Sequence, residues 1–123
     1  SGNAYFQLGN NEIALERLNK AVGLKNNFQE AYQVRSVVLI ELRRYQEALD
    51  DCRKSLKIKE DEKGYYNLAR VYDKLEMYPE AVEAYRLSIE ENPRVLEAHF
   101  ALASLLYQTE SYPALQRWHK LMK

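Results

Sequence analysis

The stretch "MYPEAVEAYRLSIEENP" (Met77–Pro93) decides the fold, because its opening phrase returns three times elsewhere in the chain. "YPEAV" begins at Tyr78, "YQEAL" at Tyr45, "YPALQ" at Tyr112 and "NEIAL" at Asn11, so successive phrases start 33 or 34 residues apart. A fixed period of this length is typical of stacked repeats, in which each unit buries its apolar face against its neighbours. The repeat therefore has to be interpreted before any single motif.

Each period predicts a helix, a turn and a second helix. Within residues 62–76, apolar side chains recur at helical spacing along one face. Pro79 suits the start of the second helix, because a proline there gives up an amide that has no partner. Pro93 ends that helix, because the residue before a proline is pushed out of the α region. The pattern predicts no strand, a turn before Asn11 in the first period, and helices near 29–43, 46–59, 62–76, 78–92, 96–109 and 113–122.

Small residues recur where the two helices of a pair should approach each other closely. They lie on the first helices and again twelve residues later, near the start of the second helices: Gly2, Ser36, Ala69 and Ala103, and then Ala14, Ala48 and Ala81. Large side chains at matching positions are predicted to fill the surrounding core, namely Tyr5, Leu39, Tyr72, Leu106, Leu18, Cys52 and Tyr85.

The composition is that of a folded globular domain, with 46% hydrophobic and 29% charged residues in a chain of 123. Its 18 basic and 18 acidic residues cancel, which gives no reason to expect binding to nucleic acid or to a membrane. Cys52 is the single cysteine and can form no internal disulfide, so we expect a reducing compartment, the cytoplasm. The chain begins within a helical pattern and without a leader, which predicts that it is a fragment of a longer protein.

Residues that would carry catalysis are sparse. His99 and His119 lie 20 residues apart without a second cysteine nearby, so they form no recognisable metal-ligand set, and their places in the repeat predict packing roles. Cys52 follows two aspartates but takes the core position of Tyr85, which predicts a small buried side chain rather than an activated thiol. No phosphate-binding glycine loop appears in the sequence. We therefore expect no enzyme activity, no metal and no cofactor.

This pattern strongly resembles the tetratricopeptide repeat (TPR) family. "GNAYFQLGNNEIALERLNKAVGL" and "NLARVYDKLEMYPEAVEAYRLSIEENP" follow its consensus closely, and the likeness covers the whole chain as a single array. The predicted repeats are a truncated first one (1–28), two complete ones (29–61 and 62–95) and a last one (96–123). The resemblance implies an all-α fold, a right-handed α-solenoid of antiparallel helix pairs. In that family the first helices line a concave groove that binds a peptide or a partner protein.

On this resemblance a partner would meet the faces of the first helices that lie opposite the core contacts. The predicted binding residues are Asn3, Phe6, Gln33, Val34, Val37, Ile40, Lys63, Tyr66, Asn67, Arg70, Phe100, Ser104 and Tyr107. The apolar and aromatic members form either a patch that receives a partner segment or surfaces that neighbouring repeats cover. The charges on these faces are mixed, which argues against an RNA-binding groove.

Two other functions stay open at this point. The sequence partly resembles TPR co-chaperones, which hold the acidic C-terminal tails of heat-shock chaperones in a carboxylate clamp, and Asn3 and Lys63 fall on clamp positions. Val34 and Asn67 stand where that clamp has an asparagine and an arginine, which removes donors that a carboxylate needs. The chain is alternatively a structural segment of a longer TPR scaffold, packed against further repeats, or of a multidomain enzyme.

Overall fold

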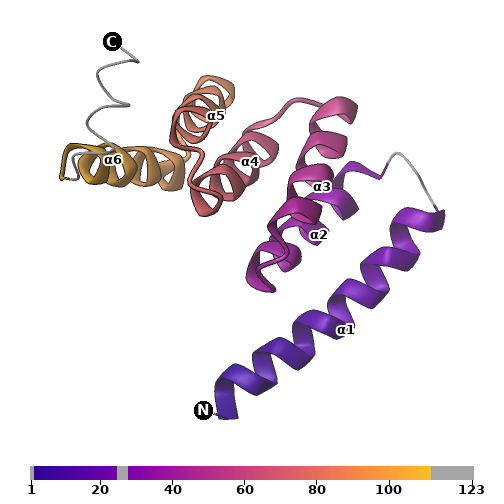
Figure 1. Ribbon diagram of the computed structural model, residues 1–123. Helices are drawn as coiled ribbons and strands as arrows, with labels where there is room; N and C mark the ends of the chain where they lie inside the picture. Colours follow the sequence, from indigo (N-terminus) through magenta and orange to yellow (C-terminus); the bar gives the residue numbers. More distant parts are fainter. Residues whose placement is uncertain (1, 25–27, 112–123) are drawn as a thin grey trace. The chain divides into compact units, whose positions relative to one another are not determined.

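The computed structural model describes residues 2–24 and 28–111, and within them the side chains of residues 10–24 and 28–108 (Figure 1). The chain divides between Glu60 and Asp61 into two compact units, and each unit is described by itself. The described residues contain no strand, which confirms the all-α prediction for this part of the chain. The first unit holds α1 (Gly2–Leu24), α2 (Gln29–Glu41) and α3 (Tyr45–Ile58), and the second holds α4 (Glu62–Lys74), α5 (Tyr78–Glu91) and α6 (Leu96–Ser111).

The pairs α2–α3 and α4–α5 are joined by the same turn. Arg43 and Glu76, which are 33 residues apart, both have a left-handed backbone with a φ of 61°. In each turn the amide of the next residue, Arg44 or Met77, donates to the carbonyl oxygen five residues back at 2.8 Å. This Schellman ending satisfies carbonyl groups that the end of a helix leaves unpaired. The repeat in the sequence is therefore also a repeat in backbone geometry.

Local signals set the ends of α2 to α6, which begin and end within two residues of the predicted bounds. Pro79 lies in the first turn of α5, where its missing amide costs nothing. Asp61 caps α4, and its Oδ1 accepts a hydrogen bond from the amide of Gly64 at 2.9 Å. The helix predicted at 113–122 lies outside the described residues.

The predicted turn before Asn11 is wrong for this structure. α1 runs without a break from Gly2 to Leu24 (Figure 1), about 35 Å of helix. Continuing the helix through residues 2–9 keeps the backbone hydrogen bonds that a turn would break. Glu12 stands where the later repeat has Pro79, so no missing amide stops the helix.

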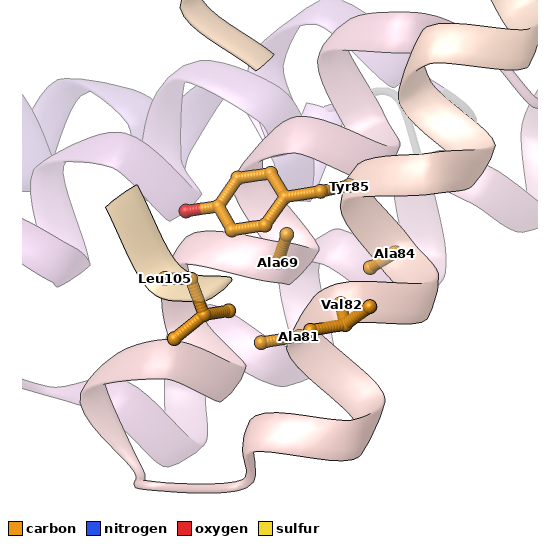
Figure 2. Packing of buried hydrophobic residues seen from close by; sticks show 6 residues of the cluster. All are labelled: Ala69, Ala81, Val82, Ala84, Tyr85 and Leu105. Atoms are coloured by element: carbon orange, nitrogen blue, oxygen red, sulfur yellow. The ribbon is translucent and has the colours of Figure 1, made fainter. Parts of the chain in front are cut away.

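The core of the second unit confirms the close packing that was predicted at small residues. Ala69 of α4 and Ala81 of α5 are fully buried, and Figure 2 shows the ring of Tyr85 beside the methyl group of Ala69. Because neither alanine extends beyond a methyl group, the two helices can approach each other closely. The whole cluster consists of Ala69, Ala81, Val82, Ala84, Tyr85 and, from α6, Leu105.

The first unit repeats this arrangement and adds a polar connection. Ser36 and Ala48 are fully buried, and Cys52 is buried as predicted. Arg35 of α2 donates from Nε and Nη2 to the carboxylate of Asp51 in α3, at 2.7 Å in both hydrogen bonds. Its Nη1 also donates to Oδ1 of Asn19 in α1 at 3.1 Å. One guanidinium group thus connects all three helices of the unit.

Two packing predictions need correction. Ala103 is exposed, because α6 turns a different face, with Ala98 and Leu105, into the core, and the helix expected over Ala103 lies outside the described residues. His99 is also exposed, and its Nε2 lies 2.8 Å from the carbonyl oxygen of Pro93 instead of packing in the core. Leu18 is half-buried and packs against a buried cluster of the first unit, as predicted. Gly2, Tyr5 and His119 lie outside the side chains that the structure describes.

Candidate functional site

The second unit contains a hollow between the first turns of α4 and α6. Lys63 and Tyr66 of α4 line one side, Val95 and Glu97 at the start of α6 line the other, and Glu62 completes the rim. The hollow has a volume of about 370 Å³, which falls within the usual size range of ligand pockets. Two residues predicted from the sequence, Lys63 and Tyr66, are thus brought together with residues of the following repeat.

Tyr66 is held in place by two neighbours. Its ring centroid lies 5.9 Å from that of Tyr85, with 55° between the ring planes, an arrangement in which aromatic pairs attract each other. The guanidinium carbon of Arg70 lies 5.9 Å from the centre of the Tyr66 ring, within range of a cation–π interaction. Burial raises the pKa of the Tyr85 hydroxyl far above its usual value, so this neighbour stays protonated. Tyr66 therefore offers an ordered aromatic surface to the hollow.

The outward side of α6 continues this surface. Phe100 and Tyr107 are 73% and 74% exposed, although Ala98 and Leu105 on the other side of the helix are buried. Phe100 lies one turn from Glu97, which lines the hollow, and Tyr107 lies two turns further on the same side. Single exposed apolar side chains are ordinary, but a row that continues from a hollow marks a candidate binding surface. We call this surface the aromatic face and define it as Lys63, Tyr66, Glu97, Phe100, exposed Ser104 and Tyr107.

Charges around the aromatic face balance one another. Lys63 and Arg70 are cationic, and Glu62 and Glu97 on the rim are anionic. Asp73 lies about one turn beyond Arg70, and burial raises the pKa of its carboxyl group. With no net field to attract a charged ligand, selectivity at this surface has to come from shape and apolar contact.

The first unit contributes less of the predicted surface. Val34 is 45% exposed, and Gln33 and Val37 are half-buried. Ile40 is only 5% exposed, so its prediction as a binding residue is corrected. α2 is apolar nearly all round, which is the pattern of a helix covered on most sides.

Asn67 is the second corrected residue, because its side chain is 7% exposed. It shares a buried stripe of α4 with Gly64 and Val71, at the spacing of one helix face. Asn3 and Phe6 lie outside the side chains that the structure describes. Of the positions where the co-chaperone resemblance expects clamp residues, Lys63 is exposed, Val34 has no side-chain donor and Asn67 is buried.

Val95 and Glu62 line the hollow but were not predicted from the sequence. Both lie where a first helix begins, one residue before α6 and at the first residue of α4. A positional signal was available, since side chains at the start of one first helix can border the preceding first helix. Valine and glutamate are common residue types, so neither indicates a binding site by itself.

The part of the chain that the structure describes contains neither a membrane-spanning helix nor a cluster of metal ligands. None of its helices is both long and apolar enough to cross a membrane. Within the same residues, histidine, cysteine, aspartate and glutamate side chains form no group of three or more that could hold a metal ion.

Comparison with known proteins agrees with the repeat architecture. Residues 1–63 and 62–95 match two family models, each described as Tetratricopeptide repeat. The chain is 32% identical over 95 residues to Tetratricopeptide repeat protein 12 of Mus musculus, a match that covers 76% of this chain and 14% of that protein. The chain therefore spans about one-seventh of the length of this curated relative.

Solved structures share the fold. The TPR domain of Arabidopsis OM64 matches with a TM-score of 0.76 and 26% identity, over 85% of this chain and 87% of that one. The first TPR of Spaghetti (RPAP3), in a structure bound to the HSP90 peptide SRMEEVD, matches with a TM-score of 0.78 and 21% identity, over 90% and 88% of the two chains. At that identity the second likeness shows the fold alone. The predicted all-α repeat solenoid is confirmed.

Proposed function

This chain belongs to the tetratricopeptide repeat family of interaction modules, and we propose that it is a non-enzymatic domain that binds an extended partner segment along the aromatic face. One observation carries the proposal, the apolar hollow at the start of α4 and α6 with the exposed rings of Phe100 and Tyr107 beyond it. Aromatic side chains are frequent anchors of interfaces, because they bury a large area for little loss of conformational entropy.

The dimensions of the aromatic face suit an extended segment. In the proposed complex the hollow receives one apolar side chain of the partner against the ring of Tyr66. Phe100 and Tyr107 are seven helical residues apart, about 10 Å along α6. An extended chain covers that distance in about three residues. The expected ligand is therefore a short segment with two apolar side chains, three or so residues apart, and no requirement for net charge.

A heat-shock chaperone tail is the second candidate, because the RPAP3 domain that shares this fold binds the HSP90 peptide SRMEEVD. Lys63 is exposed and stands on a clamp position. Val34 offers no donor, and buried Asn67 presents none on the surface, so one described cation would hold the terminal carboxylate. A carboxylate that loses water without gaining charged donors binds weakly. We therefore rank this ligand below an apolar segment.

Selection from a random peptide library on phage, followed by calorimetric titration, tests the proposal. We expect selected peptides to bind the chain with micromolar affinity and to bind Phe100→Ala about tenfold more weakly, the effect of losing one moderate anchor. Leu24→Ala is the matched control, because Leu24 is an exposed apolar residue that does not belong to the aromatic face. Its affinity should equal that of the unchanged chain.

Two outcomes would contradict the proposal. Peptides that bind Phe100→Ala and Tyr66→Ala as tightly as the unchanged chain would place the site elsewhere. Tight binding of SRMEEVD that is lost in Lys63→Ala but kept in Phe100→Ala would make the chaperone tail the ligand. Circular dichroism of each variant checks that the helices remain folded.

The proposed compartment follows from the single thiol of the chain, and the proposed class of partner follows from its net charge of zero. Cys52 is the single cysteine of the chain and is buried, which suits the reducing cytoplasm that we propose as the compartment. Balanced charge favours a protein or peptide partner over nucleic acid or a membrane. The alternative role, as a segment of a longer TPR scaffold or of a multidomain enzyme, predicts that further repeats of the same chain cover the aromatic face.

A further inference from the structure

The C-terminal half of α1 has an apolar face that its counterparts in the later repeats keep covered. Ala14 occupies the repeat position of Ala48 and Ala81, which are both fully buried, yet Ala14 is half-exposed. One turn further, Leu18 packs on one side against the buried cluster of the first unit but stays partly exposed. Its counterparts, Cys52 of α3 and Tyr85 of α5, are buried.

This uncovered face forms a hollow. Ile13 on its rim is 53% exposed and Val34 is 45% exposed, both large apolar side chains. The hollow has a volume of about 420 Å³ and lies between α1 and α2. It is lined by Asn10, Ile13, Ala14, Arg17, Leu18 and Val34, and the five α1 residues follow one helical stripe.

The later repeats indicate what belongs in this hollow. In the second unit the corresponding face of α5 is covered by its own first helix, α4, and Ala69 of α4 lies in one cluster with Ala81. The sequence period makes residues 2–9 the counterpart of residues 69–76, the second half of α4 and the turn after it, with Gly2 matching Ala69 and Ala14 matching Ala81. The straight α1 carries Gly2 about 18 Å along the helix axis from Ala14, too far for contact within one chain.

We propose that residues 2–9 of a second copy of this chain lie in the hollow, so that two chains exchange their first segments in a domain-swapped dimer. Each chain has one segment to give and one hollow to fill, so the exchange is reciprocal and closes as a twofold dimer. The segment "GNAYFQLG" contains no charged residue, which matches an apolar hollow. This interface involves the first unit only and is independent of the proposed ligand site in the second.

The sequence around the hinge allows this exchange. Gly9, Asn10 and Asn11 are poor helix formers, so the energy difference between a straight helix and a hairpin is small. Opening a hinge of this kind is a common route to swapped dimers. A hairpin monomer is the competing arrangement, and the tests below separate the two.

Single-cysteine chains provide the direct test. Gly2→Cys and Ala14→Cys are made separately in a Cys52→Ala background, mixed in equal amounts, equilibrated and oxidised. Because each chain has one cysteine, only contact between chains can join position 2 to position 14. We expect a covalent heterodimer as the main product on a non-reducing gel, identified by mass spectrometry. Gly2→Cys mixed with Glu16→Cys is the matched control, because exposed Glu16 lies on the other side of α1 from the hollow, and it should give little product.

Two results would overturn the proposal. One is a mixture of Gly2→Cys and Ala14→Cys that gives no more heterodimer than the Glu16→Cys control. The other is a chain carrying both cysteines that oxidises mainly to a crosslinked monomer, which would show a hairpin. A disulfide requires the two Cα atoms to lie within about 7 Å, so a straight α1 cannot form that internal bond.

A proline variant tests the same proposal without crosslinking. Glu12→Pro introduces proline at the repeat position of Pro79, where a hairpin accepts it but a continuous helix does not. We expect the dimer of the 123-residue chain, measured by analytical ultracentrifugation, to weaken at least a hundredfold in this variant. Glu12→Ala should dimerise as the unchanged chain does. A chain that stays monomeric at every concentration, or a dimer that Glu12→Pro leaves unchanged, would refute the exchange.

Discussion

Replacing Asp51 by asparagine should destabilise the first unit by about 3 kcal/mol. Asp51 accepts two hydrogen bonds at 2.7 Å from Arg35, and the two side chains are 3% and 15% exposed. These hydrogen bonds and the charge of Asp51 raise the pKa of Arg35 above its usual value. The variant keeps the shape of the side chain and one acceptor oxygen, but it removes the negative charge that compensates the guanidinium group of Arg35 and replaces the second acceptor by an amide donor.

The size of the effect follows from burial. Removing one partner of a buried ion pair costs about 3–5 kcal/mol, because the other charge stays buried without compensation. The lower end applies here, since Arg35 keeps some contact with water. Arg44 and Glu47 form an exposed pair three residues apart, with side chains 44% and 54% exposed. Breaking an exposed pair changes stability little, because water screens both charges, so Glu47→Gln is the matched control.

Native-state hydrogen exchange shows which helices lose stability in Asp51→Asn. In repeat proteins stability is roughly a sum over neighbouring repeats, so amide protection should fall by about a hundredfold in α2 and α3 and much less in α5. Urea unfolding gives the total change. A double variant, Arg35→Met with Asp51→Leu, should recover most of the loss because it buries no charge. Loss of less than about 1 kcal/mol in Asp51→Asn, or equal loss in Glu47→Gln, would refute this reasoning.

Three further predictions concern single side chains. Asp61→Ala should lower the free energy of unfolding by about 1 kcal/mol in urea titrations, because the cap on Gly64 is lost, whereas Asp61→Asn should change it by a few tenths. Asp73→Asn should raise the thermal midpoint at pH 7 and leave it unchanged near pH 3. Burial raises the folded-state pKa of Asp73, so stability is lost as the pH rises through its unfolded value, and the amide removes that loss. Cys52 should react with a thiol reagent in urea but not in the native chain, because it is buried.

For each of these three predictions, one result would contradict it. An equal loss in Asp61→Ala and Asp61→Asn would mean that the cap does not stabilise α4. A pH-independent effect of Asp73→Asn would assign the change to packing rather than to charge. Thiol labelling of the folded chain at the rate of the unfolded one would show that Cys52 is accessible.

The bounds of α2 to α6 could be predicted because the signals that set them are local. Pro79 and Asp61 act within one turn of the helices that they start. Turns at Arg43 and Glu76 recur because the surrounding sequence recurs. The small residues Ser36, Ala48, Ala69 and Ala81 are all fully buried, as the spacing of the pattern indicated.

Features that depend on interactions between residues far apart in the sequence were not predicted. The turn before Asn11 was expected from the period, but no proline enforces it, and α1 continues through this position. Ile40 and Asn67 were predicted to face a partner, yet both are buried here. The Arg35–Asp51 pair joins residues 16 apart on different helices, and only the packed unit brings them together.

The most direct test of the central claim is an NMR titration of the 15N-labelled chain with a library-selected peptide. If the first helices of the second unit form the binding surface, the largest amide shifts should fall at Lys63, Tyr66 and Phe100, with small shifts at the exposed α5 residues Glu83 and Arg86. Shifts concentrated on α5 or spread over α3, with the aromatic face unchanged, would contradict the account.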